Sequence, residues 1–485
     1  MKYRFHASAE TVSAPHQRVR EIAPPPPARG ILGLLAAALL FPLVTSAQVS
    51  SLGSWSAPQP WIYACIHATL LPTGKVLYWP GYTGDTPKFW DPVTTRVTDA
   101  PHAGYNIFCG GNALNSQGNV VAVGGQLVLL FGLKDNATFN PFKNAWTRSP
   151  QMKFARWYPT VTALPNGDVL ALSGLNEHSV AVPTPEIFQA ATGRWKPLTT
   201  ALQELPLFPR SFVAPNGKVF VATTISRYLD TSGTGAWTPV ARRLVAGRDD
   251  YGSAAMYEPG KVIFVGGADA PVNTCEIINL NDAVPAWRAT GSMIRARRQH
   301  NLTLLPDGKV LATGGSSGFG IDNAAGRNLF AEVWDPATGR WSRLAPQQVY
   351  RGYHSSALLL PDGRVLSGGG SGHPNSEVFF PPYLFNGNRP VITAAPGTVG
   401  YTGHFTITTP DPANVIKVTL TALGSATHAQ NFGQRFISLP FTRVPGGVSV
   451  SAPANPNVCP PGYHMLWIIN ARGIPSVSKM VKVAP

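Results

Sequence analysis

The stretch Leu360-Pro361-Asp362-Gly363-Arg364-Val365-Leu366, followed by Gly368-Gly369-Gly370, decides the fold because close copies of it recur along the chain. Proline presets φ and glycine accepts a positive φ, so Pro-Asp-Gly between two apolar runs predicts the turn of a β-hairpin. We expect a hairpin at every copy, and the other copies begin at Leu71, Asn115, Leu164, Ala214, Glu258 and Leu305.

The copies recur every 43 to 55 residues or so, which is close to the kelch period. Strands with aromatic ends between the copies, such as Val333 to Trp341, supply a second hairpin for each four-stranded unit. Seven copies predict a seven-bladed kelch-type β-propeller, because one blade cannot bury both of its faces alone. We expect the ring to close where residues before Leu71, including Trp61 and Tyr63, pair with the last blade near Val378 to Phe380.

The repeat stops after Pro381-Pro382, which marks a second domain. Ile392 to Val483 consists of short alternating strands with Gly, Pro and Asn turns, a pattern typical of an immunoglobulin-like β-sandwich. We therefore expect an all-β chain, with the propeller over residues 48–386 and the sandwich over 387–485. The composition agrees, because 48 Gly, 46 Pro and only 13% charged residues suit short strands and tight turns.

Residues 1–47 have the order of a secretory signal peptide: a long basic leader, the apolar run Ile31 to Val44, and the small residues Thr45-Ser46-Ala47. The run is too short to span a bilayer comfortably, although an uncleaved anchor is the alternative. This segment predicts a secreted or cell-envelope protein.

The chain is basic, with a net charge of +15, but it lacks the features of a nucleic-acid-binding protein. Arg295 to Arg298 is a short cluster, and no dense Lys/Arg run has interleaved aromatic residues. We expect a monomer without a nucleic-acid partner, whose charge favours association with acidic polymers or cell-surface material.

Four places interrupt the repeat with reactive side chains, namely Cys109, Tyr158, the pair Tyr353-His354, and His428 in the second domain. The first three lie a similar distance ahead of their hairpin turns, at inner strand starts that converge on a propeller axis. Two imidazoles and phenolate oxygens form the mixed N,O set that Cu(II) prefers. Zinc would more often recruit three histidines or a carboxylate.

These motifs resemble the galactose oxidase and glyoxal oxidase family of copper-radical oxidases over nearly all of the mature chain. The most specific match is Arg351 to Val365 with the following glycines. The motifs that fall in the family's order are Phe108-Cys109, Arg156-Trp157-Tyr158, Ala426-Thr427-His428 and Pro461 to Leu466.

The resemblance implies one copper ion, with Tyr158 as an equatorial ligand joined to Cys109 by a thioether. It implies that His354 and His428 are the nitrogen ligands and that Tyr353 is the axial ligand and general base. The thioether would make Tyr158 easier to oxidise to a radical. Copper and the radical would then each take one electron from an alcohol or aldehyde, and O₂ would leave as H₂O₂.

The chain departs from galactose oxidase where that enzyme shields its tyrosine and binds its sugar. Asn176 stands where a tryptophan would stack, so Trp157 or another aromatic must replace it. The sugar-binding residues have no clear counterpart in 203–210 or 269–272. We therefore expect a small aldehyde such as glyoxal, or a primary alcohol, as the substrate. His300 lies at another strand start, and we expect it to be a candidate for a residue that supports the copper ligands without binding the ion.

Each residue also has a simpler interpretation. Cys109 could be a packed small side chain or half of a disulfide, and the pairing of Cys65, Cys275 and Cys459 is open. Tyr158 could pack in the core, and His354 and His428 could be structural. The main alternative function is a non-enzymatic kelch propeller that binds a glycan or a protein. A hydrolase is disfavoured, because no paired carboxylates or Ser-His-Asp set occur at the strand starts.

Overall fold

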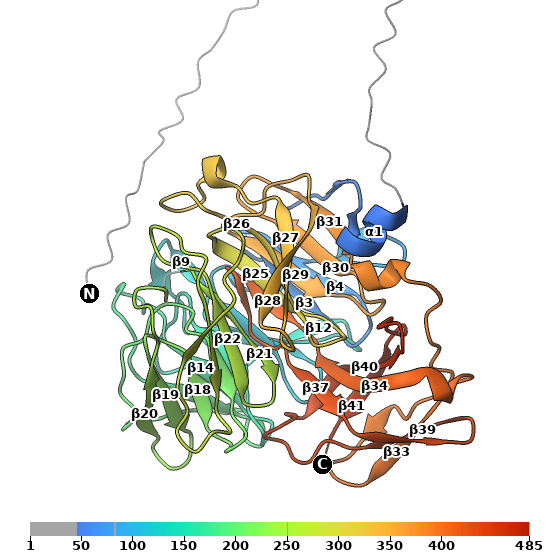
Figure 1. The fold of residues 1–485 in the computed structure, drawn as a ribbon. Coiled ribbons are helices and arrows are strands. Elements are labelled where there is room, and N and C mark those ends of the chain that lie inside the picture. Colours follow the sequence, from blue (N-terminus) through green and yellow to red (C-terminus); the bar gives the residue numbers. More distant parts are fainter. Residues whose placement is uncertain (1–45, 82–83, 250, 485) are drawn as a thin grey trace, which may run out of the picture. The chain divides into compact units, whose positions relative to one another are not determined.

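The computed structural model describes residues 46–81, 84–249 and 251–484 (Figure 1). The basic leader and apolar run of the predicted signal peptide fall in 1–45 and lie outside the described residues. In the part of the chain that the structure describes, no helix has both the length and the apolar character needed to cross a membrane.

Each copy of the repeated phrase forms the predicted hairpin turn. In the last copy, β29 (Ser355–Leu359) pairs antiparallel with β30 (Val365–Gly369), and Gly363 between them adopts a φ of +85°. Asp362 accepts a hydrogen bond from the backbone N–H of Arg364 at 3.0 Å, which closes the turn from the side-chain side. The local sequence is therefore sufficient to specify this element.

Seven antiparallel sheets in the described residues share one pattern, in which a hairpin made by one copy of the phrase is extended by two further strands. We number the sheets in chain order. Their strands are β3 (His67–Leu70), β4 (Val76–Trp79), β5 (Lys88–Trp90), β6 (Val97–Asp99); β7 (Gly111–Leu114), β8 (Val120–Val123), β11 (Asn136–Asn140), β12 (Ala145–Arg148); β13 (Thr160–Ala163), β14 (Val169–Leu172), β15 (Glu186–Gln189), β16 (Arg194–Pro197); β17 (Ser211–Val213), β18 (Val219–Val221), β19 (Ile225–Asp230), β20 (Ala236–Arg242); β21 (Ser253–Glu258), β22 (Lys261–Val265), β23 (Cys275–Asn279), β24 (Arg288–Thr290); β25 (Arg298–Leu304), β26 (Val310–Ser316), β27 (Phe330–Asp335), β28 (Arg340–Pro346); and β29, β30, β31 (Asn375–Phe380) with β1 (Ser54–Trp55). The remaining small elements of this region are α1 (Ser46–Leu52), β2 (Gln59–Pro60), β9 (Gln126–Val128), β10 (Phe131–Gly132), η1 (Ala324–Gly326) and η2 (Pro382–Phe385).

The N-terminal strands complete the seventh sheet, as predicted, although the pairing residues differ from those expected. Ser54 pairs with Phe380, and Gln59 pairs with Ser376. Trp61 only follows these strands and donates its backbone N–H to the Pro374 carbonyl at 2.8 Å. This pairing joins the two ends of the repeat region, while the count of seven blades in one propeller stays a prediction.

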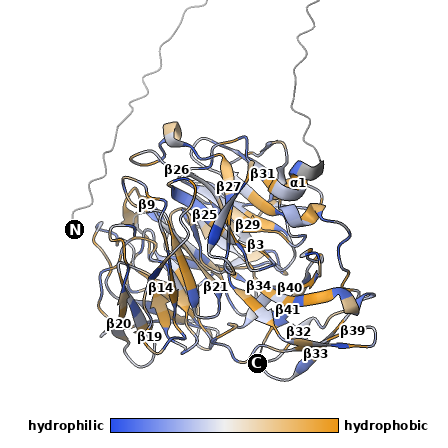
Figure 2. Cartoon of the chain, in the orientation of Figure 1, coloured by the Kyte–Doolittle hydropathy of each residue, from blue (hydrophilic) through white to orange (hydrophobic). Residues whose placement is uncertain are grey.

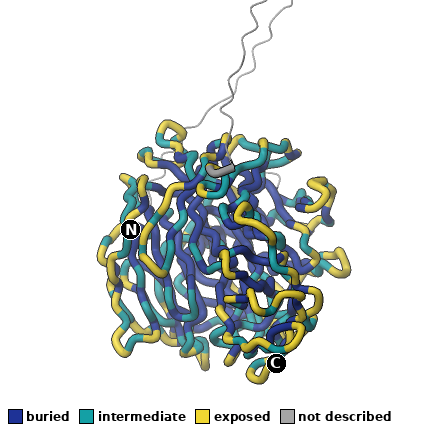
Figure 3. The backbone as a smooth tube through the Cα atoms, turned by 45° about the vertical axis from the view of Figure 1, so that its right-hand side comes forward, coloured by how far each residue is buried: buried dark blue, intermediate teal, exposed yellow. Residues whose placement is uncertain are grey.

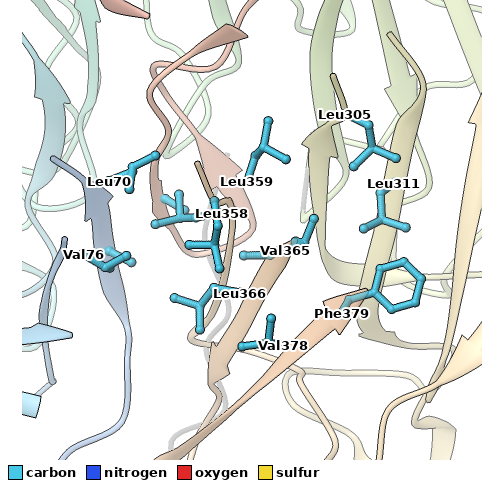
Figure 4. Packing of buried hydrophobic residues seen from close by; sticks show 14 of the residues in the cluster. Leu70, Val76, Leu305, Leu311, Leu358, Leu359, Val365, Leu366, Val378 and Phe379 are labelled. Carbon is cyan, nitrogen blue, oxygen red and sulfur yellow. The ribbon is translucent and has the colours of Figure 1, made fainter. Parts of the chain in front are cut away.

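Buried apolar side chains pack between neighbouring sheets. One cluster combines Leu70 of the first sheet, Leu311 of the sixth, and Leu358 with Leu366 of the seventh (Figure 4). Hydrophobic residues occur along many of the strands (Figure 2), and the exposed residues concentrate in the connecting loops (Figure 3). Because each fully buried leucine contributes about 1.5 to 3 kcal/mol, this cluster stabilises the contact between the first and last sheets.

The C-terminal region forms two sheets around a core of its own. Ile407, Val418, Val448 and Ile468 belong to one buried cluster that receives side chains from both sheets, which is the arrangement of a β-sandwich. The strands are β32 (Thr398–Val399), β41 (Lys479–Val483), β40 (Gly462–Asn470), β34 (Val415–Ala422) and β37 (Phe436–Leu439) in one sheet, and β33 (His404–Thr408), β39 (Gly447–Ser451) and β38 (Phe441–Val444) in the other, with η3 (Pro412–Asn414) between β33 and β34.

A hairpin of the C-terminal region leaves the sandwich and joins the first sheet. It consists of β35 (Ser425–Thr427) and β36 (Gln430–Asn431), and β35 pairs with β3 through His67 and Thr427. The fifth sheet also holds this hairpin, since Ser253 Oγ donates to the Ala429 carbonyl at 2.9 Å. His428, at the tip of the hairpin, is thereby carried to the inner strands.

Candidate functional site

The predicted site residues share an unusual backbone conformation. Cys109, Tyr158, His354 and His428 have φ values of 61°, 62°, 65° and 49°. Residues other than glycine rarely adopt this left-handed conformation, and those that do cluster at functional sites. In the sheets, the conformation occurs one or two residues before the inner strands β7, β13 and β29, where the chain turns into the sheet.

The structure brings the four predicted ligands together. The ring centres of His354 and His428 lie 4.6 Å apart at an angle of 89°. The Tyr158 ring lies 4.5 Å from the His428 ring, and the Tyr353 ring lies 3.8 Å from the His354 ring. The hydroxyls of Tyr158 and Tyr353 are hydrogen-bonded to each other. Two phenol oxygens and two imidazoles, from three distant segments, thus occupy one small volume.

The two imidazoles have the properties that a metal ion requires. The Nε2 atoms of His354 and His428 are buried and have no hydrogen-bond partner, while Nδ1 of His428 lies 2.6 Å from Thr427 Oγ1. Burial lowers the pKa of His354 to about 3 and the pKa of His428 well below its usual value. Both rings are therefore neutral, and a buried nitrogen lone pair without a partner is costly unless a ligand binds it.

The two phenols complete a donor set that fits copper. Burial raises the pKa of Tyr158 and of Tyr353 well above the usual value, so a nearby cation is needed to stabilise either phenolate. Among the residues that the structure describes, no three or more His, Cys, Asp or Glu side chains are grouped to hold a metal ion. The two imidazoles and two phenols instead provide the N,O set that suits Cu(II).

Cys109 lies beside Tyr158. The backbone N–H of Tyr158 donates to the Cys109 carbonyl at 2.8 Å. Burial raises the pKa of the Cys109 thiol, and hydrogen bonding to the side chain of Tyr158 opposes that rise. All four cysteines, which lie in the described residues, are buried and free. The alternative that Cys109 is half of a disulfide is therefore wrong, and Cys65, Cys275 and Cys459 are not bridged to one another.

Aromatic rings cover Tyr158. The Trp157 ring stacks on it with centres 3.5 Å apart and an angle of 5°, and the Phe208 ring lies 4.5 Å away at 28°. Trp157 therefore stands in the stacking role that the sequence left open. Asn176 does not take part, because its Oδ1 accepts backbone N–H groups of His178 and Val180 and closes its own loop.

His300 lies near the site without contacting the ligand rings. It is fully buried on β25, and neither of its ring nitrogens has a hydrogen-bond partner. Burial and the charge of Arg297 lower the pKa of this imidazole well below its usual value. Ser253 Oγ lies within hydrogen-bond distance of the His300 carbonyl and of the carbonyl of Ala429, the residue after His428. This indirect link is the connection that the structure shows between His300 and the ligands.

His67 also lies close to the ligand rings. The His67 ring stacks on Trp79 and lies 5.6 Å from the His428 ring. Its Nδ1 hydrogen-bonds Asn112 Oδ1 at 3.0 Å, while its Nε2 is buried without a partner. No motif marks this position, because His67 is one residue of an ordinary buried inner strand.

Three further residues were missed although the sequence contained a signal for them. Phe208, Tyr251 and Gln299 have φ values of 47°, 55° and 58°. Each lies nine residues before the turn glycine of its sheet, the same offset as Cys109 and Tyr158. The Tyr251 ring meets the Tyr353 ring edge-on at 5.5 Å. Counting back from every turn glycine would have found all three.

Comparison with known proteins defines the class of the chain first. Residues 264–384 match the family described as glyoxal oxidase N-terminus, and residues 389–483 match the galactose oxidase-like early set domain. A solved structure titled "Novel fungal alcohol oxidase with catalytic diversity among the AA5 family, in complex with copper" superposes with a TM-score of 0.82 at 24% identity. The superposition covers 90% of this chain and 100% of the chain in the solved structure. The chain is thus an all-β protein of the galactose oxidase-like fold.

Curated proteins with similar sequences agree with this fold. Galactose oxidase of Gibberella zeae is 29% identical over 91% of this chain and 73% of its own length. The aldehyde oxidase GLOX of Vitis pseudoreticulata is 28% identical over 69% of this chain and 73% of its own length. The chain is thus similar to galactose oxidases and to aldehyde oxidases of the glyoxal oxidase type, in agreement with the resemblance of its motifs.

Proposed function

We propose that this protein is a copper-radical oxidase that oxidises a small aldehyde or a primary alcohol with O₂ and releases H₂O₂. The observation that carries the proposal is the meeting of the Tyr158 and Tyr353 hydroxyls with two buried, unpartnered imidazole nitrogens. The names of the relatives, galactose oxidase and aldehyde oxidase, support the same chemistry.

Tyr158, Tyr353, His354 and His428 would hold the copper ion. When bound, copper supplies a centre that accepts one electron and later returns it to O₂. Tyr158, linked to Cys109, would hold the second oxidising equivalent as a phenoxyl radical. The link forms when the S–H bond of Cys109 and one ring C–H bond of Tyr158 are replaced by a C–S bond, and the two protons and two electrons that are released pass to O₂ to give H₂O₂.

Tyr353 would act as the general base. As a phenolate it accepts the proton of the substrate hydroxyl, which for an aldehyde belongs to the hydrated form. The Tyr158 radical then removes a hydrogen atom from the substrate carbon that carries this hydroxyl. Trp157 and Phe208 stack near the Tyr158 ring, and Phe108 and Leu175 extend this apolar cluster. The cluster keeps water from the oxidised ring.

Arg210 is the arginine nearest to the position where sugar binding would be expected, and its guanidinium is engaged in hydrogen bonds within the protein. Arg210 is buried, and its guanidinium donates to the carbonyls of Phe208, Asp249 and Gly252. Asp269, in the other divergent segment, forms a 2.6 Å ion pair with Arg298. Neither group is free to hold several sugar hydroxyls. This occupation favours a small glyoxal-like aldehyde or a primary alcohol over galactose.

The proposal extends to processing and organisation. Residues 1–47 would be a signal peptide, residues 48–386 the propeller, and residues 387–485 the immunoglobulin-like domain. The protein would act as a secreted or cell-envelope monomer, and its basic charge would favour acidic cell-surface material.

Two measurements test the function. Metal-free protein is incubated with copper and air, the copper is removed, and the intact mass is recorded; the thioether predicts a loss of about 2 Da and a shift in denaturing gel mobility. Peroxide release is then measured with glyoxal, methylglyoxal, primary alcohols and galactose. An unchanged mass together with no peroxide would overturn the oxidase in favour of a binding propeller.

A further inference from the structure

Gln126 contacts both side chains that distinguish this site, the Cys109 thiol and the Trp157 indole. Its Oε1 accepts a hydrogen bond from Cys109 Sγ at 3.3 Å and another from Trp157 Nε1 at 3.1 Å. The indole N–H can only donate, and the carbonyl oxygen is the one acceptor of an amide side chain. The two bonds together therefore fix the orientation of the Gln126 amide.

The backbone holds Gln126 in this position. A Cβ atom at Gly124 would lie 2.3 Å from the Arg156 carbonyl, so glycine allows this close approach beside Trp157. The N–H of Gln126 donates to the carbonyl of Asn106, three residues before the cysteine, at 3.4 Å. The residue after the glycine pair is thus held between the segments that carry its two partners.

We propose that Gln126 is a positioning residue that prepares the thiol for the cysteine-tyrosine link and keeps the indole stacked on the linked ring. This inference rests on the proposed function. Formation of the link breaks the S–H bond and one ring C–H bond, makes one C–S bond, and passes two electrons and two protons to O₂, giving H₂O₂. Gln126 neither gains nor loses atoms in this step. Its role is to hold the thiol hydrogen on its Oε1, so that the sulfur can face the Tyr158 ring.

The same amide acts on Trp157 after the link has formed. The sulfur no longer carries a hydrogen, whereas the indole N–H remains and still needs an acceptor in a buried site. A bonded indole stays parallel to the Tyr158 ring, at the 3.5 Å separation seen in the structure. Loss of the acceptor would allow the indole to tilt and would expose the oxidised ring.

The test compares two variants with a matched control. Gln126→Met keeps the size of the side chain and removes the acceptor, whereas Gln126→Glu keeps an acceptor. Gln347→Met is the control, because Gln347 is also buried and accepts a hydrogen bond, from Ser367 Oγ at 3.3 Å, but has no contact with the site residues. Thermal unfolding of each metal-free protein establishes that it is folded.

The first readout is the rate at which the intact mass falls by about 2 Da after copper and air are added. We expect Gln126→Met to slow this rate by about tenfold, as loss of one buried hydrogen bond would, and Gln126→Glu to restore most of it. The second readout is the half-life of the visible absorption of the oxidised protein, which should shorten in Gln126→Met. Gln347→Met should match the wild type in both.

Wild-type rates and half-lives in Gln126→Met would overturn the role of Gln126. That outcome differs from failure of the proposed function, in which the wild-type protein itself loses no mass. A Gln126→Glu variant as slow as Gln126→Met would also contradict the proposal, because the acceptor, and not the shape of glutamine, is held to be responsible.

Discussion

Two sets of inner strand starts can be compared in this molecule. Those of the second, third and seventh sheets present Cys109, Tyr158 and His354, and those of the fourth, fifth and sixth present Phe208, Tyr251 and Gln299. All six residues have left-handed φ values and precede their turn glycine by nine residues. The φ values are thus similar in both sets, and the sets differ in the side chains that they present.

The largest effect is expected from Tyr158→Phe, at a reactive start. Removing the phenol removes a proposed metal ligand and the radical, so peroxide release should fall by about 10³-fold or more. Peroxide assays at saturating copper measure this loss. Circular dichroism should remain that of the wild type, since the phenylalanine ring can keep the contact with Trp157. Substantial activity in this variant would remove the distinction between the two sets.

A smaller effect is expected from Thr427→Val, which leaves the ligands in place. The Thr427 hydroxyl lies 2.6 Å from Nδ1 of His428 and orients that ring. Losing an outer partner of a metal-bound histidine typically weakens metal affinity by about 10- to 100-fold. Copper titration against a competing chelator measures the affinity. Thr421→Val is the control, because Thr421 is likewise buried but accepts a hydrogen bond from Trp467.

Tyr251→Phe tests the second set of starts directly. The Tyr251 ring lies edge-on to Tyr353 but is not one of the proposed ligands. We expect kcat/KM to change by no more than about tenfold, with the mass loss on copper treatment intact. A loss as large as that of Tyr158→Phe would place Tyr251 among the reactive residues.

Asn176→Ala should have the smallest effect. The Asn176 side chain bonds to the backbone of its own loop, so its removal should cost about 1 kcal/mol of stability. Thermal unfolding measures the stability, and the lifetime of the oxidised protein should match the wild type. A shortened lifetime would show that this loop shields Tyr158 after all.

Much of the fold could be predicted because each hairpin is specified locally by a Pro-x-Gly or related turn. The five chemically distinctive residues of the site could be predicted because cysteine, tyrosine and histidine interrupt an otherwise regular repeat. The position of β35 on β3 is a long-range pairing with no local signal, so the sequence does not show that His67 lies close to His428. Counting along the chain placed Asn176 at the position of a stacking residue. It could not show that the stacking ring comes from Trp157, the residue next to Tyr158.

The hairpin that carries His428 also determines at which stage of synthesis all the proposed ligands are present. This residue lies near the end of the 485-residue chain, whereas Cys109 and Tyr158 are made early. A partly synthesised or C-terminally truncated chain would hold the sulfur and the phenols but only one of the two ligand imidazoles. We therefore expect the proposed thioether to form only in molecules that contain the hairpin with His428.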